Sequence, residues 1–428
     1  MDLTAGRPFW PIRDGLIATY PPLDRDLACD VAIVGGGLTG GFVALALAEA
    51  GVDVVLLDKR DAGTGSSAAC TGLLQYEIDL PLIDLIDHIG QEKAVQSYLL
   101  CLEAINKIEA LTKRLGDDCG FARRKSLYLA SRKSDVADMK REYAARRGCG
   151  IKLDLLSARE IRSRFGLRFP AALLSHDAGE IDAYRLTHAL LLGAKKASLR
   201  AFDRTRVTRI EHRPHGKNVV GKRVDGEKVG GKEAGARNAG GKNTVILHTD
   251  RGPRVSARKI VFATGYETER YLRDPRVKLK TTYALVSEPI QSFDRWSERC
   301  LLWETRRPYF YARTTSDNRI ILGGGDDDFI NPDAHTALLR RRITTLRRKF
   351  RKMFPRIDLE VAYKWSGVFG ESDDGLPFIG ECNKVPNAYF ALGYGGNGIT
   401  YSLLAGDLLR DRFLNRPNPA TDLFSFNR

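Results

Sequence analysis

The segment from residue 30 to residue 60, DVAIVGGGLTGGFVALALAEAGVDVVLLDKR, constrains the fold of this chain most strongly. An apolar run at residues 31–34 predicts a buried parallel strand, and glycines follow it at GxGxxG spacing. A helical pattern then runs to residue 50, and a second apolar strand at residues 52–57 ends in Asp58. This order of strand, turn, helix, strand and acid is typical of a dinucleotide-binding βαβ unit.

Each part of such a unit has a separate task. Gly35 permits the tight turn, Gly37 lets a pyrophosphate approach the backbone, and Gly40 lets the helix pack closely on the strand. The helix N-terminus offers free N–H groups and its positive dipole end to phosphates, and Asp58 can accept hydrogen bonds from ribose hydroxyls. The alternative is a tight βα turn that binds no nucleotide, which the complete order of elements disfavours.

Length and composition restrict the class of protein. The 428 residues exceed one ordinary core and favour two domains or a discontinuous pair. No apolar run is long enough to span a bilayer. The seven cysteines show no CxxC motif and the seven histidines show no metal spacing. We therefore expect a cytoplasmic protein without a membrane span, a disulfide framework or a metal site.

The net charge of +15 would attract anionic partners. Residues 213–242 are rich in Gly and Lys and poor in large apolar residues, so we expect a mobile loop there. A basic tract can also bind nucleic acid or an acidic membrane surface. Because no aromatic residues are interleaved for base stacking, the solvated loop is favoured and a nucleic-acid partner is not expected.

The remaining chain shows a second domain and a second glycine loop. Residues 1–29 carry PFWP and YPPL and are expected to form an irregular lead-in. Apolar residues at helical spacing over residues 85–115 predict long helices outside the nucleotide domain. Alternating segments at residues 281–289, 308–313 and 319–324 predict antiparallel strands. GYGGNGIT, at residues 393–400, precedes another helix and aims a second helix N-terminus.

Several of these motifs occur together in one known family. VAIVGGGLTG with Asp58, GTGSSAACTG, RTRVTRI, KIVFATG, DGLPFIG, GYGGNGIT and the closing LFSFNR span nearly the whole chain. In this order they resemble the FAD-dependent D-amino-acid oxidase-like (DAO) family of oxidoreductases. LLQYEID, RRPYFYAR and LGGGDDD resemble its γ-glutamylputrescine oxidoreductase branch most.

The resemblance implies an α/β fold with an α+β substrate domain. A Rossmann-like FAD-binding domain would take residues 24–83, 182–276 and 363–428. A discontinuous substrate domain with an antiparallel sheet over the flavin would take residues 84–181 and 277–362. The residues implied in FAD binding are Gly35, Gly37, Leu38, Thr39, Gly40, Asp58, Lys59, Arg60, Ser66, Ser67, Thr71, Gly72, Val207, Ala263, Thr264, Gly265, Gly393, Gly395, Gly396, Asn397, Gly398, Ile399 and Thr400.

The resemblance also indicates where a substrate would lie, and the predicted catalytic residues are Gln75, Tyr309, Tyr311 and Arg313. Arg313 could bind a carboxylate or form an ordinary salt bridge in the sheet. The two tyrosines could hold an amine by cation–π contact or serve as packing. Glu77 could pair with an ammonium or form an ion pair at the domain edge.

Four positions depart from the family pattern. Gly367 stands where some members tether the flavin through a cysteine, so we expect non-covalent FAD. Gln75 and Thr400 stand where basic residues hold a substrate carboxylate, so that clamp is expected to be absent. Ile321 stands where a lysine is linked to oxygen activation, which leaves a dehydrogenase as open as an oxidase.

The implied activity is oxidation of a C–N bond of a small amine or amino acid to an imine, with hydride chemistry supplied by FAD. The electron acceptor would be oxygen or is unknown. Two alternatives stay open: a flavin-dependent hydroxy-acid or glycerol-phosphate dehydrogenase, and a tRNA-modifying flavoprotein.

Overall fold

The βαβ unit forms where the sequence predicts it. In the computed structural model, β2 (Leu27–Val34) and β3 (Val54–Leu57) are parallel, and α2 (Leu38–Glu49) connects them. The structure describes residues 4–213, 220–223, 244–272, 274–296, 298–329 and 335–428.

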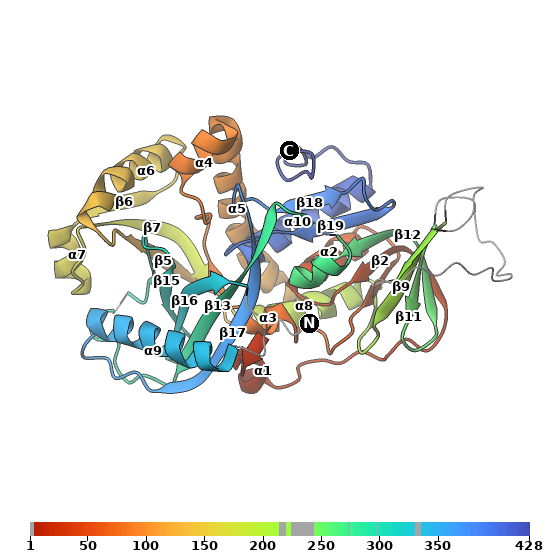
Figure 1. Cartoon of the computed structure of the whole chain (residues 1–428), viewed down its shortest axis with the longest axis horizontal. Coiled ribbons are helices and arrows are strands. Elements are labelled where there is room, and N and C mark those ends of the chain that lie inside the picture. Colours follow the sequence, from red (N-terminus) through yellow and green to blue (C-terminus); the bar gives the residue numbers. More distant parts are fainter. Residues whose placement is uncertain (1–3, 214–219, 224–243, 273, 297, 330–334) are drawn as a thin grey trace.

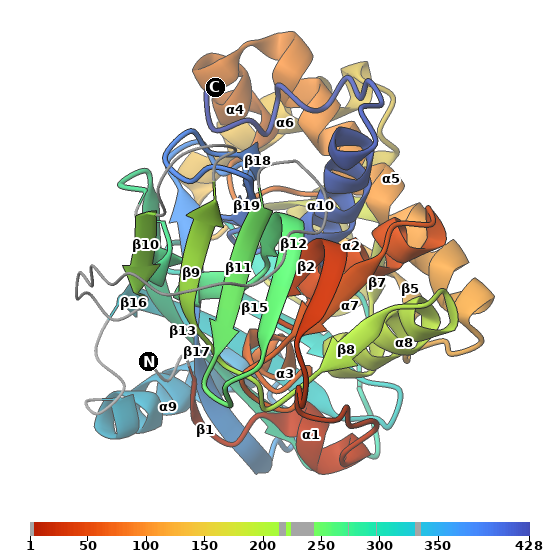
Figure 2. The same ribbon diagram turned by 90° about the vertical axis from the view of Figure 1, so that its right-hand side faces the viewer.

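The βαβ unit belongs to a sheet that, in the described part of the chain, follows the order β10-β9-β11-β12-β2-β3-β8. β12, β2, β3 and β8 are parallel, and β11, β9 and β10 continue the sheet as an antiparallel meander (Figure 2). β19 pairs in parallel with β12, and β18 pairs antiparallel with β19. The strands not yet bounded are β8 (Arg200–Phe202), β9 (Val207–Arg213), β10 (Val220–Arg223), β11 (Thr244–Thr249), β12 (Arg254–Phe262), β18 (Phe378–Glu381) and β19 (Ala388–Leu392).

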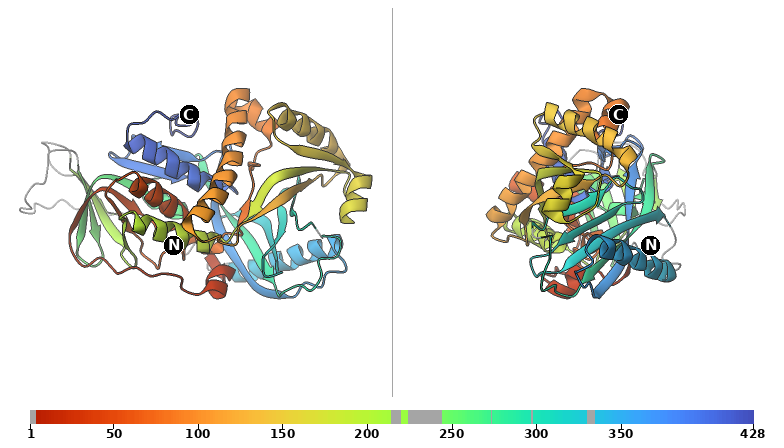
Figure 3. Two further views of the ribbon diagram at one scale, coloured as in Figure 1. Left: turned by 180° about the vertical axis from the view of Figure 1, so that it is seen from behind. Right: turned by 90° about the vertical axis from the view of Figure 1, so that its left-hand side faces the viewer.

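A layer of helices packs around α2. α8 (Ala183–Lys196) and α10 (Gly398–Phe413) both contact α2, and α5 (Gln91–Leu115) contacts α8 and α10. Side chains of all four helices share one apolar cluster. The expectation that the helices of residues 85–115 lie outside the nucleotide domain stays a prediction, and α5 packs against two helices assigned to that domain, α8 and α10. One side of this helix is apolar enough to be buried, and it runs between the two sheets (Figure 3).

The second sheet is larger and follows the order β1-β17-β13-β16-β15-β14-β5-β7-β4 among the described residues, with β6 paired to β7. It is antiparallel except for β14 and β5, which run parallel. Its strands are β1 (Thr4–Gly6), β4 (Leu73–Leu74), β5 (Ala122–Leu129), β6 (Leu153–Ser157), β7 (Ala171–Glu180), β13 (Val277–Ser287), β14 (Leu301–Glu304), β15 (Phe310–Thr314), β16 (Ile320–Asp328) and β17 (Val361–Ser372).

Short helices flank the larger sheet (Figure 1). α9 (His335–Met353) packs on β13, β16 and β17 through an apolar cluster that includes Leu339, Ile343 and Phe350. α7 (Ala158–Phe165) begins with the capping box that the sequence predicts, since Ser157 and Glu160 bond each other's backbone N–H groups. The further helices are α1 (Phe9–Asp14), α3 (Ser66–Ala69), α4 (Leu82–Ile89), α6 (Val136–Gly148), and the 3₁₀ turns η1 (Lys133–Asp135) and η2 (Gly265–Arg270).

Two segments expected to be irregular are partly ordered. In the N-terminal lead-in, β1 pairs with β17, and Trp10 of α1 is buried and donates its indole N–H to the Cys70 carbonyl at 2.6 Å. In the Gly/Lys-rich segment 213–242, β10 pairs with β9, so these residues are not loop. The prediction of a mobile loop otherwise falls on residues 214–219 and 224–242, outside the described part of the chain.

The α/β fold class is confirmed, and the division into two discontinuous domains stays a prediction. The sheets differ from that division at two places. β4 lies within residues 24–83, expected in the FAD-binding domain, but pairs with β7 of the larger sheet. Residue 363 was expected to begin the last part of the FAD-binding domain, but β17 belongs to the larger sheet up to Ser372.

Gly40→Ala tests the closeness of helix and strand in the βαβ unit. A Cβ at Gly40 would lie 1.9 Å from the carbonyl oxygen of Gly35, whereas a Cβ at Gly148, at the exposed end of α6, would meet nothing within 4 Å. We expect Gly40→Ala to lower the free energy of unfolding by about 1–3 kcal/mol or more. Gly148→Ala should leave it unchanged or raise it by up to about 1 kcal/mol. Thermal unfolding followed by circular dichroism compares them, and equal melting temperatures would contradict the close approach.

Candidate active site

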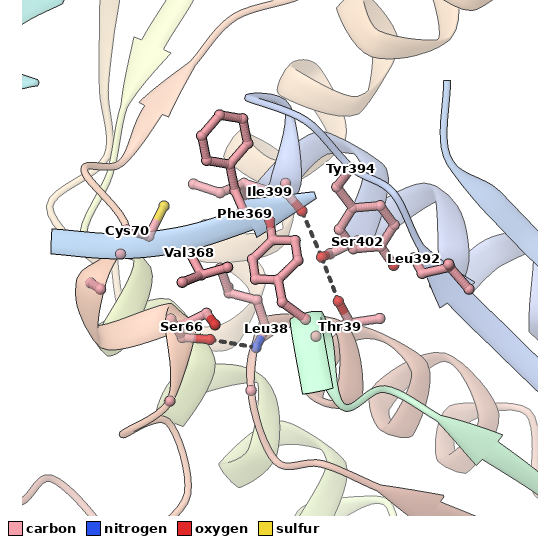
Figure 4. A pocket seen from close by; sticks show the side chains of 18 of the residues that line it. Leu38, Thr39, Ser66, Cys70, Val368, Phe369, Leu392, Tyr394, Ile399 and Ser402 are labelled. Atoms are coloured by element: carbon pink, nitrogen blue, oxygen red, sulfur yellow. Dashed lines mark hydrogen bonds between the residues drawn. The ribbon is translucent and has the colours of Figure 1, made fainter. Parts of the chain in front are cut away.

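One long cavity lies between the two sheets and collects the residues that the sequence singled out. Every residue predicted to bind the cofactor lines this cavity except Gly40, and so do Gln75, Tyr309 and Tyr311. Gly40 does not line the cavity, but its lack of a Cβ allows α2 to approach the Gly35 carbonyl closely. Figure 4 shows side chains from α2, α3, β17 and α10 around the cavity.

The first glycine loop forms one end of the cavity. Gly35 has a φ of +110°, and a Cβ there would lie 2.4 Å from the carbonyl oxygen of Ala263, so the ends of β2 and β12 meet backbone to backbone. Gly37 precedes α2 without a side-chain cap, and the N–H of Leu38 donates to Ser67 Oγ at 2.9 Å. An uncapped helix N-terminus beside small residues fits a pyrophosphate.

Asp58 ends β3 at the same end of the cavity. Its Oδ2 accepts the Gly36 N–H at 2.6 Å and its Oδ1 accepts the Arg60 N–H at 2.8 Å. Burial raises the pKa of the Asp58 carboxyl, and these two hydrogen bonds oppose that shift. The carboxylate is thus fixed in orientation, and each oxygen keeps a second lone pair that a ribose hydroxyl can use.

Lys59 and Arg60 line the cavity but are paired within the protein. Both side chains contact Glu267, Lys59 at 2.7 Å and Arg60 at 3.2 Å. Glu267 was missed, although it follows the small residues at the end of the KIVFATG strand. We call this region, with Asp58 and Val207, the nucleotide end.

The second glycine loop joins both halves of the cavity wall. The side chain of Asn397 donates to the carbonyl of Gln75 at 3.0 Å and to that of Glu77 at 2.9 Å. It therefore leaves the N-terminus of α10 without a side-chain cap. Thr39 and Ser402 share a 2.8 Å hydrogen bond that ties α2 to α10 (Figure 4). An open helix N-terminus can stabilise negative charge that develops on a bound ring system.

Aromatic side chains from the larger sheet form a wall of the cavity. Tyr309 donates its hydroxyl hydrogen to the carbonyl of Asp79 at 2.8 Å, and the Tyr311 hydroxyl accepts from Thr71 at 3.3 Å. The sequence missed Trp303, whose indole donates to Ser126 and whose ring lies 6.4 Å from that of Tyr309. We call Trp303, Tyr309 and Tyr311 the aromatic wall.

Arg313 does not line the cavity, so the structure opposes its predicted role in substrate binding. The side chain is 2% exposed. It donates to the carbonyls of Thr71 at 2.6 Å and Ile181 at 3.2 Å, and lies 3.6 Å from Glu180. Arg313 lies on the same face of β15 as Tyr311 but farther along the strand, where it forms the ordinary structural salt bridge that was the alternative.

Three carboxylates unnoticed in the sequence line the cavity close to the second glycine loop: Asp79, Asp326 and Glu371. The Asp79 carboxylate accepts a hydrogen bond from the Gly396 N–H at 2.6 Å. The backbone of Glu371 forms an isolated antiparallel β-bridge with that of Tyr394. We call these three residues the acidic cluster. Each sits in a different segment, so no local pattern brought them together, although EID, LGGGDDD and FGES are visibly acidic.

The acidic cluster has raised pKa values. Burial raises the pKa of Asp326 to about 6, and the negative charges of Glu371 and Asp79 contribute in the same direction. Burial, then the charge of Asp79, raises the pKa of Glu371, and burial raises that of Asp79. Carboxylates that raise one another's pKa compete for protons, which is a common feature of functional sites.

Other predicted positions lie as follows. Gly367 lines the cavity and cannot form a thioether, while Cys70 also lines it, and burial raises the pKa of the Cys70 thiol. Ile321 is buried in an apolar cluster with Trp10 and Trp365 and is not part of the cavity lining. Glu77 is buried 3.7 Å from Arg146, which agrees with an internal ion pair.

Neither a metal site nor a membrane helix is found in the part of the chain that the structure describes. No group of three His, Cys, Asp or Glu side chains there could hold a metal ion. No helix there combines the length and the apolar character needed to cross a bilayer.

Asp58→Asn tests the nucleotide end. We expect it to weaken FAD binding by about 1.5–3 kcal/mol, because a charged acceptor of hydrogen bonds is lost. Asp53→Asn, at the other end of β3, is the control, since the Asp53 side chain is 51% exposed and pairs with Arg200. Titration of apoprotein with FAD measures both affinities. Equal affinities in the two variants would remove Asp58 from the binding site.

Comparison with known proteins supports the cofactor. The chain is 28% identical over 413 residues to γ-glutamylputrescine oxidoreductase of Escherichia coli (strain K12), covering 92% of this chain and 85% of the relative. It is 27% identical over 412 residues to glycine oxidase of Geobacillus kaustophilus (strain HTA426), covering 93% and 96%.

Solved structures share the fold. Glycine oxidase from Geobacillus kaustophilus superposes with a TM-score of 0.69 at 22% identity, covering 94% of this chain and 99% of that one. L-Proline dehydrogenase from P. horikoshii gives a TM-score of 0.71 at 16% identity, covering 94% and 97%.

The family model described as "FAD dependent oxidoreductase" (DAO) matches residues 30–412, from the strand that begins the βαβ unit to the end of α10. This match contains both glycine loops, Asp58 and the strands of the cavity wall. The chain therefore belongs to the DAO family of FAD-dependent oxidoreductases.

Proposed function

We propose that this protein oxidises a carbon–nitrogen bond of a small amine or amino acid to an imine. The observation that carries the proposal is the single cavity that connects the nucleotide end with the aromatic wall and the acidic cluster. Two relatives, named γ-glutamylputrescine oxidoreductase and glycine oxidase, support the same chemistry, since their names give an amine and an amino acid as substrates.

The chain's own residues suit this role. When bound, FAD supplies the acceptor for the hydride equivalent that leaves the carbon next to nitrogen. The uncapped N-terminus of α10 would stabilise negative charge at one end of that cofactor. Tyr309, Tyr311 and Gln75 would position the substrate, with the aromatic faces excluding water and attracting a cationic amine.

Oxidation of a hydroxy acid or glycerol phosphate is less well supported. Both substrates are anions, and Arg313, the arginine expected to hold such an anion, is engaged with Glu180 and main-chain carbonyls. Modification of tRNA has only the net charge of +15 in its favour.

The electron acceptor that reoxidises the cofactor would be oxygen or another compound. Comparing turnover with oxygen and with an artificial dye decides between them.

The cysteines bear on the location of the protein. Seven free cysteines agree with a reducing compartment, so we propose the cytoplasm. The two discontinuous domains are retained, with β17 assigned to the substrate side.

We expect the FAD to be non-covalent. The tethering position is Gly367, and the buried Cys70 thiol, whose pKa is raised, stays protonated near neutral pH and is a poor nucleophile. Acid precipitation of the yellow holoenzyme should therefore release all flavin into the supernatant. Flavin that stays in the protein pellet would point to a covalent bond, and mass spectrometry of Cys70→Ser would locate it.

An anaerobic substrate screen tests the function. Primary amines, diamines and amino acids should bleach the visible flavin band, whereas 2-hydroxy acids, glycerol 3-phosphate and tRNA should not. Because only the neutral amine can share its lone pair with the developing cation, the bleaching rate should rise as pH increases toward the pKa of the bound amine. Bleaching by a hydroxy acid or by glycerol 3-phosphate alone would refute the proposal.

A further inference from the structure

The acidic cluster is unlike the rest of this basic protein. Asp79, Asp326 and Glu371 line the cavity together, and no Lys, Arg or His nitrogen of the described residues lies within 4.0 Å of their carboxylate oxygens. Oδ1 of Asp326 is buried and has no hydrogen-bond partner in the described part of the chain. A buried carboxylate oxygen without a partner is costly, and a bound donor would remove that cost.

One arginine stands beside the cluster without pairing with it. Arg307 lowers the pKa of all three carboxyl groups. Its guanidinium, however, lies over the ring of Tyr309, 3.4 Å from the centroid, and donates to the main-chain oxygen of Asp79. Its side chain is exposed and does not line the cavity, so a ligand cation is still needed inside.

The basic side chains that line the cavity stand at its nucleotide end. In the described chain these are Lys59, Arg60 and Arg206, and the first two are paired with Glu267. None of the described basic side chains lines the acidic end. A substrate carboxylate placed there would meet three like charges and no partner, which is unfavourable.

The reacting nitrogen is a poor occupant for this cluster. Nearby carboxylates stabilise the ammonium form of an amine, but oxidation needs the neutral form. The cluster therefore suits an ammonium group that does not react. The aromatic wall, with Trp303, Tyr309 and Tyr311, offers apolar and π surfaces for the carbon chain between two nitrogens.

We propose that the substrate is a diamine, or an amine with a second ammonium group, and that Asp79, Asp326 and Glu371 bind the ammonium that is not oxidised. The inference rests on the proposed amine oxidation. It adds that affinity at this site increases with positive charge and that a carboxylate on the substrate is excluded.

Ligands with the same number of carbons test the effect of charge. n-Butylamine, 1,4-diaminobutane and 4-aminobutanoate each have four carbons and one amino group, and their other end is neutral, positive or negative. Holoenzyme reduced with dithionite does not turn these ligands over, so isothermal titration calorimetry reads binding alone. We expect 1,4-diaminobutane to bind on the order of 10- to 100-fold more tightly than n-butylamine, as for a hydrogen bond between charged groups. 4-Aminobutanoate should bind most weakly.

Variants assign the effect to the cluster. Asp326→Asn should remove most of the preference for 1,4-diaminobutane while leaving the affinity for n-butylamine almost unchanged. Asp154→Asn is the control, since the Asp154 side chain is 54% exposed and pairs with His176 outside the cavity. If Asp326→Asn fails to fold, Glu371→Gln makes the same test. A preference that survives in both cluster variants would overturn the assignment.

The pH dependence of ligand affinity provides a second test of the site. Alkylamines remain protonated from pH 5 to pH 8, so changes in affinity over this range report the protein. Because the pKa of Asp326 is raised to about 6, the preference for 1,4-diaminobutane should be present above pH 6 and fall below it. Asp79, Glu371, Arg307 and Lys280 also interact with this group and broaden the transition.

Different experimental results would contradict the second-ammonium site and the proposed amine oxidation. If n-butylamine or an amino acid binds and bleaches the flavin as well as 1,4-diaminobutane, amine oxidation stands and the second-ammonium site is wrong. If no amine and no amino acid bleaches the flavin, the proposed function itself is wrong.

Discussion

The close backbone approach at the first glycine loop is the constraint on which the rest of the structure depends. α2 can begin directly over β2 only because position 40 carries no Cβ beside the Gly35 carbonyl. The same turn brings Gly35 against Ala263, so that β2 and β12 end at one level. This places the N-terminus of α2, Asp58 and the end of β12 around one space, and α8 and α10 then pack against α2. The shape of the dinucleotide site is thus set by backbone geometry, and polar side chains add to it.

Charge in this protein is organised at two scales. The net charge of +15 is a property of the whole surface and says little about the cavity. Inside, Glu267 already pairs with Lys59 and Arg60, whereas no described Lys, Arg or His side chain forms an ion pair with a carboxylate of the acidic cluster. The local charge of a cavity can thus have the opposite sign to the net charge of the protein.

The parts that the sequence predicted are those encoded by contiguous residues. Both glycine loops, Asp58 and the cap at Ser157 follow from local spacing, and the structure contains them. Arg313 was misjudged because the sequence of a strand does not reveal how far along it the cavity extends: Tyr311, on the same face, lines the cavity, and Arg313 does not. Asp79, Asp326 and Glu371 were missed because three separate segments bring them together. The N-terminal β1 and α1 were also missed, since their stability comes from β17 and from the groove that takes Trp10 rather than from their own pattern.

The hydrogen bonds of Asn397 join parts of the chain that are made at different times. Its partners Gln75 and Glu77 lie 322 and 320 residues earlier in the sequence. β19, which completes the parallel sheet beside β12, also comes from the last tenth of the chain. During synthesis the early βαβ unit leaves the ribosome long before the loop that closes the cavity. The complete cavity therefore forms only after most of the chain has been made, and a ribosome that stops before residue 397 releases a chain with only one of the two helix ends that would hold the flavin.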